Sequence, residues 1–469
     1  MTEANRSAQV ARFMGEMFIS IGPSVAQGRD TQLLREIVEK TAPRLDTDLK
    51  NEPEVEADLR EAVGSVYYDL GDSAKAEAMH RAALALRRQV LGHEHLLVAK
   101  SLTRLAWVLT REHRAVEAEA CLREALAVRR KLLGKDHPEI VDTLVSLGWA
   151  LQTQGKYAEA EVSYRAALAA ASKNNGLENP GAAVSLGGIG VTLFHQGKPA
   201  EAEPFLREAV ALRRKAGPKN DSNLAQLLTN LGRVLTALGK LDEAETMLRE
   251  AMTIQKMLLG GDSQPVAGLL PFLGQIAEQR GRLSEAEALL RQALAMQQKL
   301  LGSEHTEVSN SLAGLASVLA RQGRLAEAET AIHDALAMRQ RLHSYEHPLT
   351  VHMLDTLGSV LERQNQNAEA ETVLRDALAL DGRVGVKGVS MSRTRKLLGS
   401  VLTTQKKFTE AEPLLLGGVQ SFSGSPAMSE KDQREVMQAL VRLYTDWGKP
   451  APAAEWKQRL AELAPPEKR

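Results

Sequence analysis

A repeat of 42 residues constrains this chain more than any other feature. Its clearest mark is the alanine of a recurring Ala-Glu pair, at Ala76, Ala118, Ala160, Ala202, Ala244, Ala286, Ala328 and Ala370. Each step is 42 residues, and the series continues in two units of more divergent sequence, at Ala411 and Ala453. Ten related units predict a stack of small structures in which each unit buries its apolar face on the next.

The pattern inside one unit predicts two helices. An apolar stripe with helical spacing covers 144–151, Gly155 ends it, and a second stripe covers 160–168. Small residues at Gly148 and Ala160 predict that the two helices approach closely. Because aromatic residues are only 4% of the chain, helices are favoured over β-sheet. We therefore expect an all-α fold, a right-handed α-solenoid of about ten helix-turn-helix repeats.

These residues carry a family resemblance. The L-x-x-L-G/A-x-x-L…G-K-x-x-E-A-E…A-L layout of the units resembles the tetratricopeptide repeat. The 42-residue length and the L-L-G-x-x-H-P linker, as at 132–138, are similar to the kinesin-light-chain subgroup of bacterial type. The resemblance covers about Glu54–Leu463 and implies a scaffold that binds proteins. It does not imply the cargo peptides of that subgroup, because its paired first-helix asparagines are mostly missing.

The two ends differ from the middle of the chain. We expect N-terminal capping helices at 1–53, the repeat array at 54–430, and a terminal repeat with a C-terminal cap at 431–469. One apolar face of the first helix is formed by Val10, Phe13, Met14, Met17, Phe18 and Ile21. This face is interpreted as a cap on the first repeat, and contact with a partner or a membrane is the alternative.

Charge and composition narrow the function classes. Lys plus Arg and Asp plus Glu both number 59, so no net field attracts the chain to nucleic acid. A single cysteine, Cys121, excludes an intrachain disulfide framework and suits the cytoplasm. No apolar run is long enough to cross a membrane. The sequence thus predicts a cytoplasmic protein and leaves the oligomeric state open.

Catalytic and metal-binding patterns are not found in the sequence. The histidines His95, His137, His305 and His347 occupy equivalent positions in separate units, too far apart to share an ion. Gly187–Gly190 lies inside a helical stripe and is not a phosphate loop. The paired glutamates of each E-A-E segment are interpreted as solvated helix starts. The expectation is a protein that is not an enzyme, with no catalytic residue, cofactor or metal.

The first helices are expected to line the concave face of the array, where a partner protein or peptide would bind. Reading the outward positions of units two to four gives an apolar, aromatic strip, which charged residues flank, whereas units five to eight present polar and charged groups. The candidate partner-binding residues are Thr103, Trp107, Arg111, Val145, Trp149, Val191, Phe194 and Arg233. Trp107 and Trp149 hold the same place in adjacent units, and tryptophan is enriched where binding energy concentrates.

Three functions are compatible with these observations. The first is a non-enzymatic scaffold or adaptor that binds a protein or peptide in the concave groove. The second is a sensor in a bacterial signalling or defence complex that controls a separate kinase or protease, suggested by the segment 28–72. The third is a cytoskeletal or membrane-linking adaptor like the bacterial kinesin light chains. The sequence does not identify the partner or the pathway.

Overall fold

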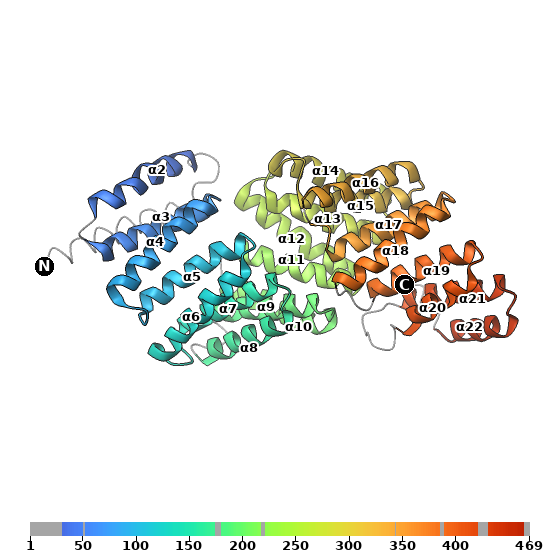
Figure 1. Ribbon diagram of the computed structural model, residues 1–469, viewed down its shortest axis with the longest axis horizontal. Helices are drawn as coiled ribbons and strands as arrows, with labels where there is room; N and C mark the ends of the chain where they lie inside the picture. The colour runs from blue at the N-terminus through green and yellow to red at the C-terminus, as the bar shows by residue number, and fades with distance from the viewer. Residues whose placement is uncertain are drawn as a thin grey trace. The chain divides into compact units, whose positions relative to one another are not determined.

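The computed structural model describes residues 31–49, 52–173, 180–216, 221–342, 344–384, 389–420 and 430–463. The described residues form 21 helices and no strand (Figure 1). This confirms the all-helical prediction. The apolar helix expected between Val10 and Ile21 lies outside the described residues.

The helices fall into two compact units, Met1–Leu238 with Met257–Leu259, and Gly239–Lys256 with Gly260–Arg469. The first unit contains α2 (Thr31–Asp48), α3 (Pro53–Asp69), α4 (Ser73–Leu91), α5 (Leu96–Arg111), α6 (Ala115–Leu133), α7 (Pro138–Thr153), α8 (Tyr157–Lys173), α9 (Pro180–His195), α10 (Pro199–Ala216) and α11 (Ser222–Ala237). Most of α12 (Leu241–Leu259) belongs to the second unit, which continues with α13 (Gln264–Gln279), α14 (Leu283–Leu301), α15 (Thr306–Arg321), α16 (Leu325–Arg341), α17 (Pro348–Arg363), α18 (Asn367–Val384), α19 (Val389–Thr404), α20 (Phe408–Gln420), α21 (Glu430–Asp446) and α22 (Pro450–Glu462).

Each repeat consists of a first helix and a second helix, from α3 and α4 in repeat one to α21 and α22 in repeat ten. Within each unit the second helix also packs against the first helix of the next repeat, as α4 does against α5 and α14 against α15 (Figure 1). This sequential stacking of helix pairs is the arrangement of an α-solenoid.

Small residues hold the helices of a pair close together. The eight in-phase alanines, from Ala76 to Ala370, are all 0% exposed. A Cβ added to Gly148 of α7 would lie 2.7 Å from Cζ of Tyr164 on α8, so only glycine fits there. The expected close approach of the two helices is therefore confirmed, and Gly188 of α9 contacts the same ring.

The first described helix and the last ones cover the ends of the array. Helix α2 packs on α3, where Val38 and Leu45 lie in one apolar cluster with Val63 and other residues. At the other end, Tyr444 and Trp456 are buried in the last cluster of the second unit. The three segment boundaries expected from the sequence stay predictions. None of the described helices has the length and apolar character needed to cross a bilayer.

Candidate protein-interaction surface

The first helices of the first unit form a continuous inner face. Neighbouring first helices contact one another from α3 to α5, α7, α9 and α11. Consecutive second helices, such as α4 and α6 or α6 and α8, make no such contacts among the described residues. Because the first helices lie closer together, they occupy the inner side of the curve within this unit. All eight candidate residues of the sequence analysis belong to first helices of this unit.

Trp149 on α7 is the most exposed aromatic side chain among the described residues, with 37% of its surface accessible. Val145 lies one turn earlier on the same helix and is half-buried. Val191 occupies on α9 the position that Trp149 has on α7, and it is also half-buried. These three side chains form the accessible apolar part of the predicted strip, which we call the Trp149 patch.

Trp107 on α5 is bound more tightly by its neighbours than Trp149 is. Its indole Nε1 donates a hydrogen bond of 2.8 Å to Oγ of Ser146 on α7. The guanidinium carbon of Arg104 lies 4.4 Å from the centroid of its ring. The two tryptophans therefore share a position in the repeat but not a role, since Trp107 helps to join α5 to α7.

Aromatic and charged side chains border the Trp149 patch on α9 and α11. Phe194 is half-buried, and the guanidinium carbon of Arg233 lies 5.4 Å from its ring centroid. Burial lowers the pKa of the Arg233 guanidinium. His195 stacks on Tyr157 with 5.3 Å between ring centroids. Burial, together with the charge of Arg233, lowers the pKa of His195.

Thr103 does not lie on the surface where it was predicted. It is 5% exposed, and its hydroxyl accepts a 3.0 Å hydrogen bond from the Arg129 guanidinium of α6. The same guanidinium nitrogen donates to Oγ1 of Thr143 on the next first helix. The prediction was wrong about exposure because Arg129, from the second helix, reaches between the two first helices and draws both hydroxyls inward.

Arg111 also has a structural contact that the sequence did not reveal. It donates a 2.7 Å hydrogen bond to the carbonyl oxygen of Tyr68 at the end of α3 and hydrogen bonds to Oγ of Ser73. Its guanidinium carbon lies 3.8 Å from the Tyr68 ring centroid. Arg321 and Arg363 donate in the same way to a carbonyl at the end of the preceding first helix. Arg111 thus caps the C-terminal end of α3, and its guanidinium group is already bonded to groups of the preceding repeat.

Buried polar contacts like that of Arg129 recur, and we call each of them a rung. A rung joins a second-helix side chain to the first helix of its own repeat and to the first helix of the next. In rung one, Arg87 forms an ion pair with Glu61 and donates a 2.7 Å hydrogen bond to Ser101. In rung six, Gln297 accepts a 2.7 Å hydrogen bond from Ser311. Rungs explain why polar residues occur inside otherwise apolar helix contacts.

The second glutamate of each E-A-E segment has a role that the sequence analysis missed. Glu119 accepts hydrogen bonds from Arg123 of its own helix and from Gln154 and Lys156 of the next repeat. Burial raises its pKa, but these hydrogen bonds outweigh burial and lower the pKa to about 2. Glu287 repeats the arrangement with Arg291, Gln322 and Arg324. The first glutamate is exposed in most of these segments, as the sequence predicted, but the second connects adjacent repeats.

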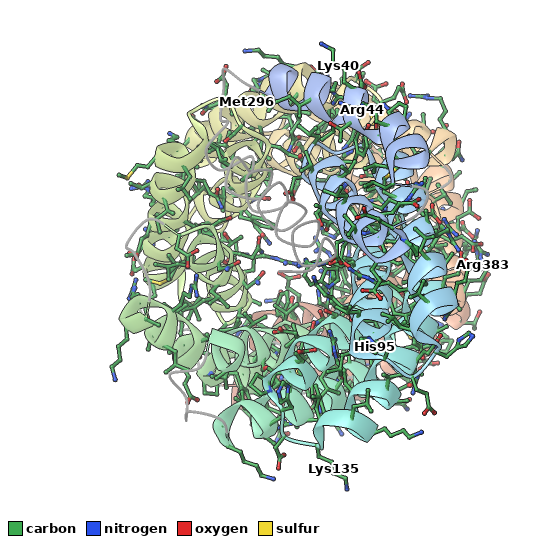
Figure 2. All side chains as sticks on the ribbon, turned by 90° about the vertical axis from the view of Figure 1, so that its left-hand side faces the viewer. Lys40, Arg44, His95, Lys135, Met296 and Arg383 are labelled. Carbon is green, nitrogen blue, oxygen red and sulfur yellow. The ribbon has the colours of Figure 1, made fainter. Side chains whose placement is uncertain are left out.

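The repeated histidines begin the first helices. The Nδ1 atoms of His95, His137, His305 and His347 each accept a hydrogen bond from the backbone N–H two residues later. Figure 2 labels His95 at this position, and Lys135, just before His137, points away from the helices. Accepting this bond requires an unprotonated Nδ1. The four histidines are therefore helix caps.

Comparisons with known proteins agree with this architecture. The family model of the MalT-like TPR region matches residues 105–301, and a tetratricopeptide repeat model matches residues 56–114 and 307–382. No curated protein matches the chain. Repeats of this family form the architecture of protein-interaction scaffolds.

Several solved structures are similar to the chain. A putative kinesin light chain from Podosopora anserina with nearly identical TPR-like repeats is 24% identical over 44% of this chain and 98% of its own, with a TM-score of 0.38. BtubC (BKLC) from P. vanneervenii is 20% identical over 53% of this chain and 93% of its own, with a TM-score of 0.39. A Rap protein complexed with Competence and Sporulation Factor is 12% identical over 78% of this chain and 97% of its own, with a TM-score of 0.58. With its 42-residue helix pairs and these family matches, the chain belongs to the tetratricopeptide repeat proteins.

Proposed function

We propose that the protein is a non-enzymatic scaffold of the cytoplasm that binds a segment of another protein, or a peptide, on the inner face of its first unit. The observation that carries this proposal is the exposure of Trp149 beside Val145 and Val191. An exposed indole with apolar neighbours and a polar surrounding has the composition of a binding hot spot. Leaving the indole in water forgoes the free energy of burying its apolar surface, and a partner bound on this face would recover that free energy.

The likeness to the Rap protein supports a regulatory version of the same activity. That protein is seen in complex with Competence and Sporulation Factor, and its fold matches most of this chain. In this second candidate function the array senses a partner and thereby controls a separate enzyme. Both functions place the partner on the first helices, so they share the experiment below.

The experiment replaces Trp149 with alanine. A partner is first captured with the native chain from an extract of its own cells, identified by mass spectrometry and purified. We expect Trp149→Ala to weaken the affinity for that partner by about 2 kcal/mol or more, about 30-fold, with little change in melting temperature. Val162→Ala is the matched control, because Val162 is 69% exposed on a second helix. Its affinity should equal that of the native chain.

The reverse pattern would contradict the proposal. If Trp149→Ala lowers the melting temperature and leaves the affinity unchanged, the indole serves packing and the partner binds elsewhere. Trp107→Ala adds a comparison within the strip. It should lower stability because it removes the hydrogen bond to Ser146.

A further inference from the structure

Rung eight has an acid at the second-helix position where the rungs described above have arginine or glutamine, and a second acid on its first helix. Asp355 of α17 stands seven repeats after Glu61, and Asp381 of α18 stands seven repeats after Arg87. Thr394 of α19 takes the place of Ser101, because the step between α17 and α19 is one residue shorter. Rung one therefore pairs an acid with a guanidinium, whereas rung eight brings two carboxyl groups together.

Both carboxyl groups are buried without hydrogen-bond partners. Asp355 is 1% exposed and Asp381 is 0% exposed. Neither oxygen of either carboxyl group has a hydrogen-bond partner among the described residues. The side chain of Thr394 favours the charged form of Asp355, but burial has the larger and opposite effect. Burying an unpaired carboxylate is costly, so each group favours its neutral form.

The cationic side chains around rung eight interact with groups other than Asp355 and Asp381. On α19, Lys396 pairs with Glu435 at 2.5 Å, and Arg395 donates a 3.2 Å hydrogen bond to the carbonyl of Gly417. Arg393, also on α19, faces the ring of His352 on α17. On α16, Arg339 donates to Asn310 and to the carbonyl of Ser344. No ion pair to Asp355 or Asp381 occurs within the described part of the chain.

We propose that rung eight is a proton-controlled joint, in which Asp355 and Asp381 hold α17, α18 and α19 together when they are protonated and loosen this contact when both are ionised. Two negative charges would then face each other inside the helix contact, without the guanidinium that joins rung one. The loosening concerns the packing of the last turn of α18, where Asp381 lies.

The sign of the pH dependence follows from the raised pKa values. Burial, reinforced by the charge of Asp381, raises the pKa of Asp355 to about 7, although Arg393 and Lys396 oppose the shift. Burial raises the pKa of Asp381 to about 6, against the effect of Arg395. The folded state then binds protons more strongly than the unfolded state, so the local stability falls as the pH rises from about 4 to about 7.

Hydrogen–deuterium exchange of the full chain can test this joint at about pH 5 and about pH 8, with exchange rates corrected for the intrinsic effect of pH. His352 has its pKa lowered to about 4 by burial and by Arg393, so it titrates in the opposite sense. It is present in every variant, so comparison between variants isolates the aspartates. For the native chain, the opening equilibrium constant of α18 is divided by the same constant in the double variant Asp355→Asn/Asp381→Asn. This ratio should increase at least about tenfold from about pH 5 to about pH 8, because a pKa shift of one unit corresponds to a factor of ten.

Two controls sharpen the test. Asp376→Asn lies on the exposed face of the same helix and should behave as the native chain. Asp381→Arg recreates rung one between an acid and a hydroxyl, and it should remove the loosening at about pH 8. An unchanged loosening in Asp381→Arg or in the double asparagine variant would overturn the proposal.

Divalent cations give the last arm of the experiment. Among the described residues no group of three or more His, Cys, Asp or Glu side chains could hold a metal ion. Added Mg²⁺ or Ca²⁺ should therefore leave the exchange of α18 at about pH 8 unchanged. If either ion restores protection, the pair is a metal site and the proton-controlled joint is refuted.

Discussion

The ring of Tyr164 leaves no room for a Cβ atom at two glycine positions, 148 and 188. The substitution Gly188→Ala therefore tests directly how these repeats pack. Tyr164 is 4% exposed and stands where most repeats have leucine. Its hydroxyl donates a 2.9 Å hydrogen bond to Oε1 of Gln152, which in turn donates from Nε2 to Thr192 on α9. Gly148 and Gly188 contact the ring from α7 and α9.

The magnitude follows from these contacts. A Cβ at position 188 would lie 2.5 Å from Cδ1 of Tyr164, whereas carbon atoms in contact prefer about 3.5–4.0 Å. The ring is blocked by Gly148 and held by Gln152, so it must move by about 1 Å or the helices must separate. Such overpacking costs about 1–3 kcal/mol, while alanine gains about 1 kcal/mol in helix propensity.

Gly268→Ala is the matched control, because Gly268 lies in α13 with nothing within 4 Å of an added Cβ. It should stabilise its helix by about 1 kcal/mol. The difference between the two variants gives the packing cost, which we expect to be about 1–3 kcal/mol. Hydrogen exchange measures it locally at α8 and α9, since a long array need not unfold in two states.

A compensating variant completes the test. Tyr164→Leu, which restores the common residue, should rescue Gly188→Ala although it destabilises the native chain by leaving a cavity. If Gly188→Ala is as stabilising as Gly268→Ala, the ring does not contact α9 as described. Close packing between these two repeats would then be refuted.

Three further predictions follow from named contacts. Glu119→Gln should destabilise the contact between α6 and the next repeat by about 1 kcal/mol. Glu201→Gln, at an exposed first glutamate, should have no effect, and hydrogen exchange of α6 and α10 checks both variants. His137→Ala should lower the stability by about 0.5–2 kcal/mol and His137→Asn should restore it, as measured by thermal unfolding. Burial raises the pKa of the Cys121 thiol, so its alkylation at neutral pH should be slow until the chain unfolds.

The fold could be predicted because the repeat makes one physical argument valid many times. The alanines at 42-residue spacing are buried as expected, and Gly148 permits the close contact that the sequence indicated. The second contact of Tyr164 with Gly188 could not be predicted in this way. It joins adjacent repeats, and periodicity within one unit does not show which side chains meet across the boundary.

The candidate surface was less predictable for the same reason. Helical periodicity places Thr103, Arg111 and Trp149 on the outward side of first helices. It does not show that Arg129 and the end of α3 capture the first two. A comparison of second-helix positions could have found the rungs, since arginine or glutamine at 87, 129, 255, 297 and 339 is unusual among buried positions. The same comparison would have singled out Asp381.

The carboxyl groups of this array respond to pH in opposite directions, and the two responses belong to different repeats. The pKa of Glu119 is lowered to about 2, so its contribution is present above its unfolded pKa and is lost as the pH falls toward 2. His80, whose pKa is lowered by burial to about 4, also disfavours acid in repeat one. Exchange in α4 and α6 should therefore increase only on acidification.

Rung eight should respond in the other direction, because Asp355 and Asp381 lose their stabilising protons as the pH rises. Raising the pH from about 5 to about 8 should increase exchange in α18 and leave α6 unchanged. Asp381→Arg should remove the alkaline response of α18 without affecting the acid response of α6. If a single pH dependence is shared by both helices, the titrating groups act on the whole chain, and the assignment of each response to its own repeat is wrong.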